Sequence, residues 1–139
     1  MENNKKIFLD INVVIDFLEH SRQRHAKIVA LIEYLTNHDY NICISEDMLT
    51  TIYYVSTNKK AVLLFLKTVV ARWQILHFGT ETIKDAINAS LEKNSDLEDS
   101  LQCFCAAANG CETLITHDKT FYDFIIYSEF FNWTSYGST

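Results

Sequence analysis

Acidic side chains follow three apolar segments of this chain, at the points where predicted strands end. Residues 7–9, 41–45 and 113–117 are followed by Asp10, by Glu46 and Asp47, and by Asp118, respectively. In an open α/β sheet, ligands bind in the crevice outside the carboxyl ends of the strands. Carboxylates gathered there repel one another and lose solvation, so such a cluster usually needs a cation. The pattern therefore predicts a divalent metal ion and a phosphate-bearing substrate.

Asp10 is the first candidate for a metal ligand. It follows Ile-Phe-Leu, and a carboxylate at the end of a buried strand is costly to leave without a partner. The alternative is a structural role as the N-cap of a helix that starts near residue 12, which aspartate performs well. Asn12 either orients Asp10 or caps the same helix.

A predicted helix over residues 95–109 carries a second group of acids. Ser95 and Glu98 have the spacing of a capping box at its start. Asp96 and Asp99 are three residues apart, which places both on one face of the helix. The alternative is that acids near a helix N-terminus simply suit the helix dipole, which explains Glu98 and Asp96 better than the deeper Asp99.

The end of the predicted strand 113–117 supplies the third group. Asp118 is either a site residue or an ordinary turn aspartate. Thr116 could hold a neighbouring carboxylate through its hydroxyl, or it could reflect β-propensity alone. His117 points away from its strand neighbours, so we expect a surface or packed histidine rather than a base.

Three further acids have stronger structural explanations. Glu46 and Asp47 follow Ser45, a predicted N-cap, and acids are expected in the first turn of a helix. Asp16 lies six residues after Asp10, where it either flanks the site or occupies a solvated helix face.

Predicted strands and helices alternate along the chain. We predict strands over residues 6–10, 40–45, 73–78, 113–117 and, weakly, 129–134, and helices over about 12–20, 22–37, 46–57, 58–71, 80–92, 95–109 and 119–126. Gly110 predicts the end of the helix 95–109. This order predicts an α/β fold: a three-layer α/β/α sandwich with a mostly parallel central sheet of four to five strands. At 139 residues, we expect one domain spanning 1–139.

Composition narrows the function classes. The net charge is -6 and the sequence pI is about 5.2, so nucleic-acid binding would depend on local basic residues and on bound metal. The candidates for contacts to a nucleic-acid backbone, otherwise surface lysines, are Lys5, Lys6, Lys59, Lys60 and Lys119. The apolar runs are shorter than the roughly 20 residues of a membrane span, so we expect no membrane association.

The cysteine pattern indicates the compartment. The four cysteines are Cys43, Cys103, Cys105 and Cys111, and none forms a CxxC pair. With no signal peptide in evidence, this is typical of reduced, buried thiols in a cytoplasmic protein. Zinc binding is the alternative.

Three motifs together resemble the PIN domain family. They are Ile7-Phe8-Leu9-Asp10-Ile11-Asn12-Val13-Val14-Ile15-Asp16, Asp96-Leu97-Glu98-Asp99-Ser100-Leu101-Gln102 and Leu114-Ile115-Thr116-His117-Asp118-Lys119-Thr120-Phe121. The first matches the family's D-x-N-V opening, the second resembles a D-x-x-D-A-L-Q helix, and the third resembles a T-x-D strand end. Their order and spacing cover essentially the whole chain.

The resemblance implies a metal-dependent ribonuclease, of the kind that includes VapC-type toxins paired with an antitoxin protein. Asp10, Asp99 and Asp118 would carry a Mg²⁺ or Mn²⁺ site, with Asp96 as a supporting acid. RNA would be the substrate, and we expect a homodimer. The family usually has a glutamate where this chain has Thr51, which leaves Glu46 or Asp47 as the acids available to replace it.

Two other functions compete with this interpretation. Thr51 is consistent with a non-catalytic PIN module that binds RNA or a protein partner. A phosphatase or receiver domain has a similar architecture, but such a phosphatase has an aspartate where this chain has Asn12, and a receiver ends its third strand on an acid where this chain has His77-Phe78-Gly79.

Overall fold

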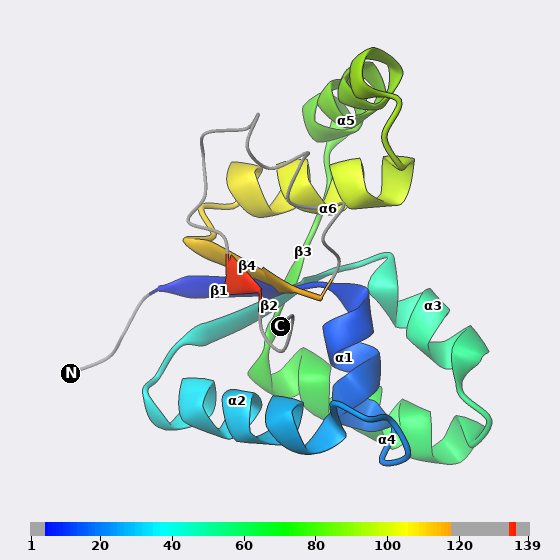
Figure 1. Cartoon of the computed structure of the whole chain (residues 1–139), viewed down its shortest axis with the longest axis vertical. Helices are drawn as coiled ribbons and strands as arrows, with labels where there is room; N and C mark the ends of the chain where they lie inside the picture. Colours follow the sequence, from blue (N-terminus) through cyan, green and yellow to red (C-terminus); the bar gives the residue numbers. More distant parts are fainter. Residues whose placement is uncertain (1–4, 118–133, 136–139) are drawn as a thin grey trace.

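The computed structural model describes residues 5–117 and 134–135 of the chain. Asp118, Lys119, the predicted helix 119–126 and most of the predicted strand 129–134 lie outside these residues. The described part is an α/β fold in which helices cover both faces of a central sheet (Figure 1). This confirms the predicted three-layer architecture.

The sheet is parallel at every described strand pair. Its strands are β1 (Lys6–Leu9), β2 (Asn41–Ser45), β3 (Gln74–Leu76), β4 (Thr113–Thr116) and β5 (Thr134–Ser135), in the order β3-β2-β1-β4-β5. Ile7 of β1 pairs with Ile42 on one side and with Thr113 on the other. Because β1 is covered on both faces, its apolar residues do not alternate with polar ones.

The helices divide between the two faces of the sheet. The helices are α1 (Ile11–Leu18), α2 (His25–Asn37), α3 (Met48–Val55), α4 (Lys59–Arg72), α5 (Thr80–Lys93) and α6 (Leu97–Ala108). In Figure 1, α5 and α6 lie on one side of the sheet and α1 to α4 on the other. All parallel strands therefore have their carboxyl ends at one edge, where α1, α3 and the loop after β4 begin.

Three predicted helix starts are wrong at the level of single residues. The helix predicted from residue 22 begins at His25, because residues 19–24 form the connection from α1. The capping box of Ser95 and Glu98 does not form: Asp96 is the N-cap of α6, and its carboxylate accepts a hydrogen bond of 3.1 Å from the backbone N–H of Asp99. Similarly, the N-cap of α3 is Asp47 rather than Ser45.

The end of α6 follows the prediction. Gly110 adopts a φ of 76°, and the N–H of Cys111 donates to the carbonyl of Ala106 at 3.0 Å. A glycine favours this left-handed conformation because it has no Cβ to clash. The chain therefore turns directly from α6 into β4, which brings the end of β4 beside the end of β1.

The core lies on both faces of the sheet, and an aromatic cluster joins α1 to α4. Phe8 and Leu114 are completely buried in the sheet. Phe17 packs against Phe65 and Trp73, with ring centroids 5.9 and 6.1 Å apart. Aromatic packing of this kind fixes α1, and with it the strand end from which α1 starts. No helix in the described residues has the length and apolarity of a membrane span.

Candidate active site

Asp10 joins β1 to α1 and is held from two directions. It is only 3% exposed, and its Oδ1 accepts a hydrogen bond of 2.7 Å from the N–H of Ile11. Its Oδ2 accepts a hydrogen bond of 2.8 Å from the hydroxyl of Thr116. The two alternatives for Asp10 thus coexist: it caps α1, and it is also a buried carboxylate at the strand ends.

Thr116 is the counterpart of Asp10 on β4. It is fully buried, and its hydroxyl is the donor that reaches Asp10 across the boundary between the two strands. The backbone N–H of Asp10 donates to the carbonyl of Ile115 at 3.0 Å, so main chain and side chains connect the same two strand ends. A carboxylate has about four lone-pair sites, and these hydrogen bonds fix the orientation of the Asp10 carboxylate.

The first turn of α6 brings three acids to this edge of the sheet. Asp96 caps the helix, Asp99 is half-buried, and Glu98 lies between them in sequence. Glu98 accepts a hydrogen bond of 3.4 Å from the side-chain amide of Gln102. In the predicted capping box, Glu98 would pair with Ser95 at the start of the helix. Because the N-cap is Asp96, this local explanation of Glu98 is wrong.

Glu98 is surrounded by other negative charges. Its partial burial raises its pKa, and the charges of Asp47, Asp96 and Asp10 raise it further. The residue as a whole is exposed, and the repulsion from these charges is the cause that bears on metal binding. The charges of three residues next to β1, α3 and α6 therefore act on Glu98, and we define the acidic cluster as Asp10, Asp47, Asp96 and Glu98. A bound cation would relieve this repulsion.

Asp47 and Thr51 lie on the third element of the site. Asp47 accepts a hydrogen bond from the hydroxyl of Ser45. The hydroxyl of Thr51 donates to the backbone carbonyl of Asp47 at 3.4 Å, inside α3. Thr51 therefore supports the start of its own helix, and Asp47 is the α3 acid that contributes charge to the cluster.

Glu46 turns toward β3. Its Oε2 accepts from Nδ1 of His77 at 3.0 Å, and its Oε1 accepts from the N–H of Phe78 at 3.3 Å. These hydrogen bonds lower the pKa of Glu46. The side chain of Glu46 therefore connects the end of β2 to the segment after β3. The neighbouring acid whose charge raises the pKa of Glu98 is Asp47.

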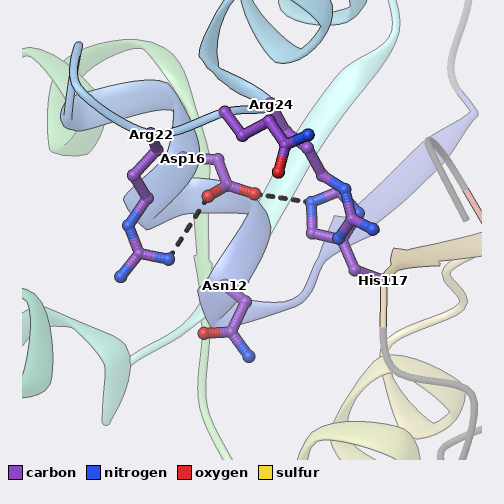
Figure 2. A pocket seen from close by; sticks show the side chains of 6 residues that line it. Asn12, Asp16, Arg22, Arg24 and His117 are labelled. Carbon is purple, nitrogen blue, oxygen red and sulfur yellow. Dashed lines mark hydrogen bonds and ion pairs between the residues drawn. The ribbon is translucent and has the colours of Figure 1, made fainter.

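Asp16 is buried, which makes the prediction of a solvated helix face wrong. It is 5% exposed and lies between Arg22 and His117 (Figure 2). Nε2 of His117 is 2.7 Å from Oδ2 of Asp16, which confirms His117 as a packed residue. Asn12, one turn before Asp16 on α1, is exposed and lines the same cavity.

Three of the lysines proposed for RNA contacts have partners elsewhere in the fold. Lys5 pairs with Glu112 at 3.6 Å, and Lys6 donates to the carbonyl of Asn109, both at the amino ends of the strands. Lys59 donates to the backbone carbonyl of Tyr53 at the start of α4. None of these three contacts is at the edge that carries Asp10.

The side chains of the acidic cluster are of the type that binds a hard divalent cation. Carboxylate oxygens are the ligands that Mg²⁺ and Mn²⁺ prefer. Within residues 5–117 and 134–135, no three His, Cys, Asp or Glu side chains converge closely enough to hold a metal ion. Asp118 follows Thr116 and His117 directly, outside the described residues. The four cysteines are buried and form no disulfide, and within the described residues they join no group of side chains that could hold a metal ion.

Comparison with known proteins identifies the family. The PIN domain family matches residues 7–125. Ribonuclease VapC1 of Aquifex aeolicus (strain VF5) is 36% identical over 124 residues, which cover 86% of each chain.

Solved structures share the fold at lower identity. VapBC2 of Rickettsia felis, bound to a DNA fragment from its promoter, matches with a TM-score of 0.71 and 18% identity, over 94% of this chain and 98% of that one. VapC20 of Mycobacterium tuberculosis, a sarcin-ricin loop cleaving toxin, matches with a TM-score of 0.65 and 14% identity, over 84% and 93% of the two chains. The extent of the family match and the identity to VapC1, together with the strand-end acids, lead to one conclusion: the chain belongs to the PIN domain family.

Proposed function

We propose that this protein is a metal-dependent ribonuclease that hydrolyses phosphodiester bonds of RNA. The observation that carries the proposal is the buried carboxylate of Asp10, which Thr116 holds and whose charge acts on Glu98 of α6 together with the charges of Asp47 and Asp96. Such a cluster suits a divalent cation at the edge of the sheet where α/β proteins bind ligands. The relative VapC1, which is named a ribonuclease, supports RNA as the substrate.

Each acid has a defined part in this proposal. Asp10, Asp99 and Asp118 would hold Mg²⁺ or Mn²⁺, and Asp96 would support them. When bound, the ion would polarise the phosphate and lower the pKa of an attacking water. Thr116 fixes the rotamer of Asp10, and the cap formed by Asp96 fixes the first turn of α6, which carries Asp99. These contacts preorganise the ligands, so less reorganisation is needed when the substrate arrives.

An RNA cleavage assay tests the proposal directly. Wild-type protein should cleave a labelled RNA with Mn²⁺ and not with EDTA. Asp10→Asn should abolish cleavage, because the amide keeps the shape of the side chain and removes its charge. Asp39→Asn is a matched control: Asp39 is exposed in the turn before β2, at a φ of 59° that asparagine tolerates. Equal cleavage by the Asp10→Asn variant, or in EDTA, contradicts the mechanism.

A second function is favoured by Thr51. The family's usual glutamate is absent at this position, and the Thr51 hydroxyl is engaged within α3. A non-catalytic module that binds RNA or a protein would have no need for that acid. Calorimetry separates the two functions: Mn²⁺ binding that is lost in Asp99→Asn supports the enzyme, and no binding at millimolar metal supports the module. If Asp47 replaces the missing acid, Thr51→Glu changes Mn²⁺ affinity less than Asp47→Asn does.

We also propose that the protein is the toxin of a toxin–antitoxin pair, acting in the cytoplasm as a homodimer. Solved structures with the same fold include VapBC from Salmonella typhimurium and a toxin–antitoxin complex from Klebsiella pneumoniae. Four buried, free cysteines agree with a reducing compartment. Induced expression should arrest growth, and co-expression of a small adjacent reading frame should relieve the arrest. Growth arrest by the Asp10→Asn variant would separate toxicity from RNA cleavage.

A further inference from the structure

A cavity of about 550 Å³ opens beside the acidic cluster. Its lining comes from α1, from the α1–α2 connection and from the residue after β4: Asn12, Asp16, Arg22, Gln23, Arg24 and His117 (Figure 2). Asn12 is two residues after Asp10, and His117 directly follows Thr116. The cavity and the acidic cluster therefore share the same strand ends. A volume in this range is typical of sites for small ligands.

Asp16 is the anchor of the cavity. A buried carboxylate is costly unless charged or polar groups surround it. Nη1 of Arg22 lies 3.3 Å from its Oδ1, and Nε2 of His117 lies 2.7 Å from its Oδ2. The backbone carbonyl of Asp16 accepts a hydrogen bond of 2.9 Å from Nδ1 of His25. Asp16 thus holds the α1–α2 connection against the end of β4, and its negative charge is used for that purpose.

The rest of the lining is rich in hydrogen-bond donors. Arg22 is 44% exposed at its side chain and keeps further N–H groups beyond the one that meets Asp16. The guanidinium of Arg24 has no hydrogen bond or ion pair within the described part of the chain. Arg24 is also the N-cap residue of α2, where no side chain caps the helix. The side-chain amides of Asn12 and Gln23 also line the cavity.

This donor set favours an anion. Two guanidinium groups line the cavity together with one carboxylate that Arg22 and His117 already contact, so the cavity offers positive charge in a protein whose net charge is -6. Arginine is the side chain best matched to phosphate, because its planar fork can donate two parallel hydrogen bonds. The acidic cluster next to the cavity needs a cation before it can accept a phosphate, whereas this cavity can accept one directly.

We propose that this cavity binds a nucleotide of the RNA strand next to the cleaved bond, with Arg24 and Arg22 on its phosphate. The proposal rests on the ribonuclease function and names a substrate subsite for it. Asn12 and Gln23 face the sugar or base of that nucleotide. Asp16 is a positioning residue that acts through Arg22 and His117.

Binding without cleavage provides the first test. Fluorescence anisotropy of a labelled single-stranded RNA is measured in EDTA over a series of KCl concentrations. Arg24→Ala should weaken binding roughly tenfold, as expected for loss of a charge-assisted phosphate contact. The slope of log affinity against log salt should fall by about 0.7 for one lost contact to a single strand. Arg72→Ala is the control, since it removes the same charge at the end of α4, and it should change neither quantity.

Kinetics provide the second test. With Mn²⁺, Arg24→Ala should raise KM more than it lowers kcat, because the subsite lies beside the reacting phosphate. Arg24→Lys keeps the charge and loses the fork, so it should recover part of the affinity. Thermal melts establish that each variant is folded, and Gln23→Ala serves as a second cavity variant if Arg24→Ala does not fold.

The outcomes separate the subsite from the ribonuclease function. Equal RNA affinity for Arg24→Ala and Arg72→Ala overturns the subsite, even when Asp10-dependent cleavage is present. Arg24-dependent binding by a protein that does not cleave RNA supports the subsite and overturns the ribonuclease proposal. If Arg24→Ala leaves RNA binding unchanged but weakens the binding of a co-expressed protein partner, the cavity binds that partner and the RNA subsite is overturned.

Discussion

Replacing Thr116 by valine tests how the site holds Asp10. Valine has nearly the shape of threonine, and the change removes the hydroxyl that donates to Oδ2 of Asp10 at 2.8 Å. Both residues are buried, so water cannot replace the lost donor without opening the site. Hydrogen bonds to charged groups contribute about 1.5–3 kcal/mol. We therefore expect a loss of about 2 kcal/mol in the free energy of unfolding of the metal-free protein.

This loss corresponds to a measurable shift in melting temperature. The entropy of unfolding is roughly 2.1 cal/mol/K per residue near 60 °C. For a chain of 139 residues, a loss of about 2 kcal/mol lowers Tm by about 7 °C. Urea denaturation of metal-free protein gives the free energy, and calorimetry gives Tm.

A double-mutant cycle assigns the loss to the pair. In an Asp10→Ala background, Thr116→Val should cost much less, since the acceptor is absent. Thr113→Val is the control on the same strand, because its hydroxyl makes no hydrogen bond within the described residues, and it should stay within about 0.5 kcal/mol of wild type. Equal losses for Thr116→Val and Thr113→Val, or an unchanged loss in the Asp10→Ala background, would refute this account of the site.

Three further predictions concern α6 and its surroundings. Partial burial and like charges raise the pKa of Glu98, so its ionised form destabilises the metal-free fold. Glu98→Gln should therefore raise Tm at pH 7, but not at a pH below the unfolded-state pKa near 4.5. High salt should reduce the difference in Tm between the variant and wild type at pH 7. If the gain persists at pH 3.5, repulsion is not its cause. Asp96→Ala should lower the free energy of unfolding by about 1 kcal/mol because it removes the N-cap of α6, whereas Asp96→Asn should change it little. A larger loss from Ser95→Ala than from Asp96→Ala would show that Ser95 is the cap. Burial raises the pKa of Cys105 to about 12, so native protein at pH 8 should leave Cys105 unalkylated by iodoacetamide until denaturant is added, as peptide mass mapping would show.

Much of the fold follows from local patterns in the sequence. The strand 6–10 lacks alternation between apolar and polar residues, which is the mark of a parallel strand covered on both faces, and β1 is indeed central. Helical spacing of apolar residues predicts α2, and Gly110 predicts the end of α6. These features depend on residues within a few positions of one another, so a single sequence is sufficient to find them.

The helix caps show where local reasoning fails. Ser95 and Ser45 both stand where an N-cap is expected, yet the N-caps lie one or two residues later, at Asp96 and Asp47. Several polar residues in a row compete for each cap. Packing against the sheet, rather than the intrinsic preference of one residue, selects the phase of the helix.

The candidate site divides in the same way. The sequence alone determined that acids stand at the ends of strands and on one face of a helix, since strand ends and helical spacing are local properties. Only the tertiary structure decided that Asp47 and Glu98 join Asp10, that Glu46 turns to His77, and that Asp16 is buried beneath Arg22 and His117. The physical reason is that these partners come from different strands and helices. Their meeting depends on strand order, on the packing of α1 and α6 against the sheet, and on the cost of leaving a buried carboxylate unpaired.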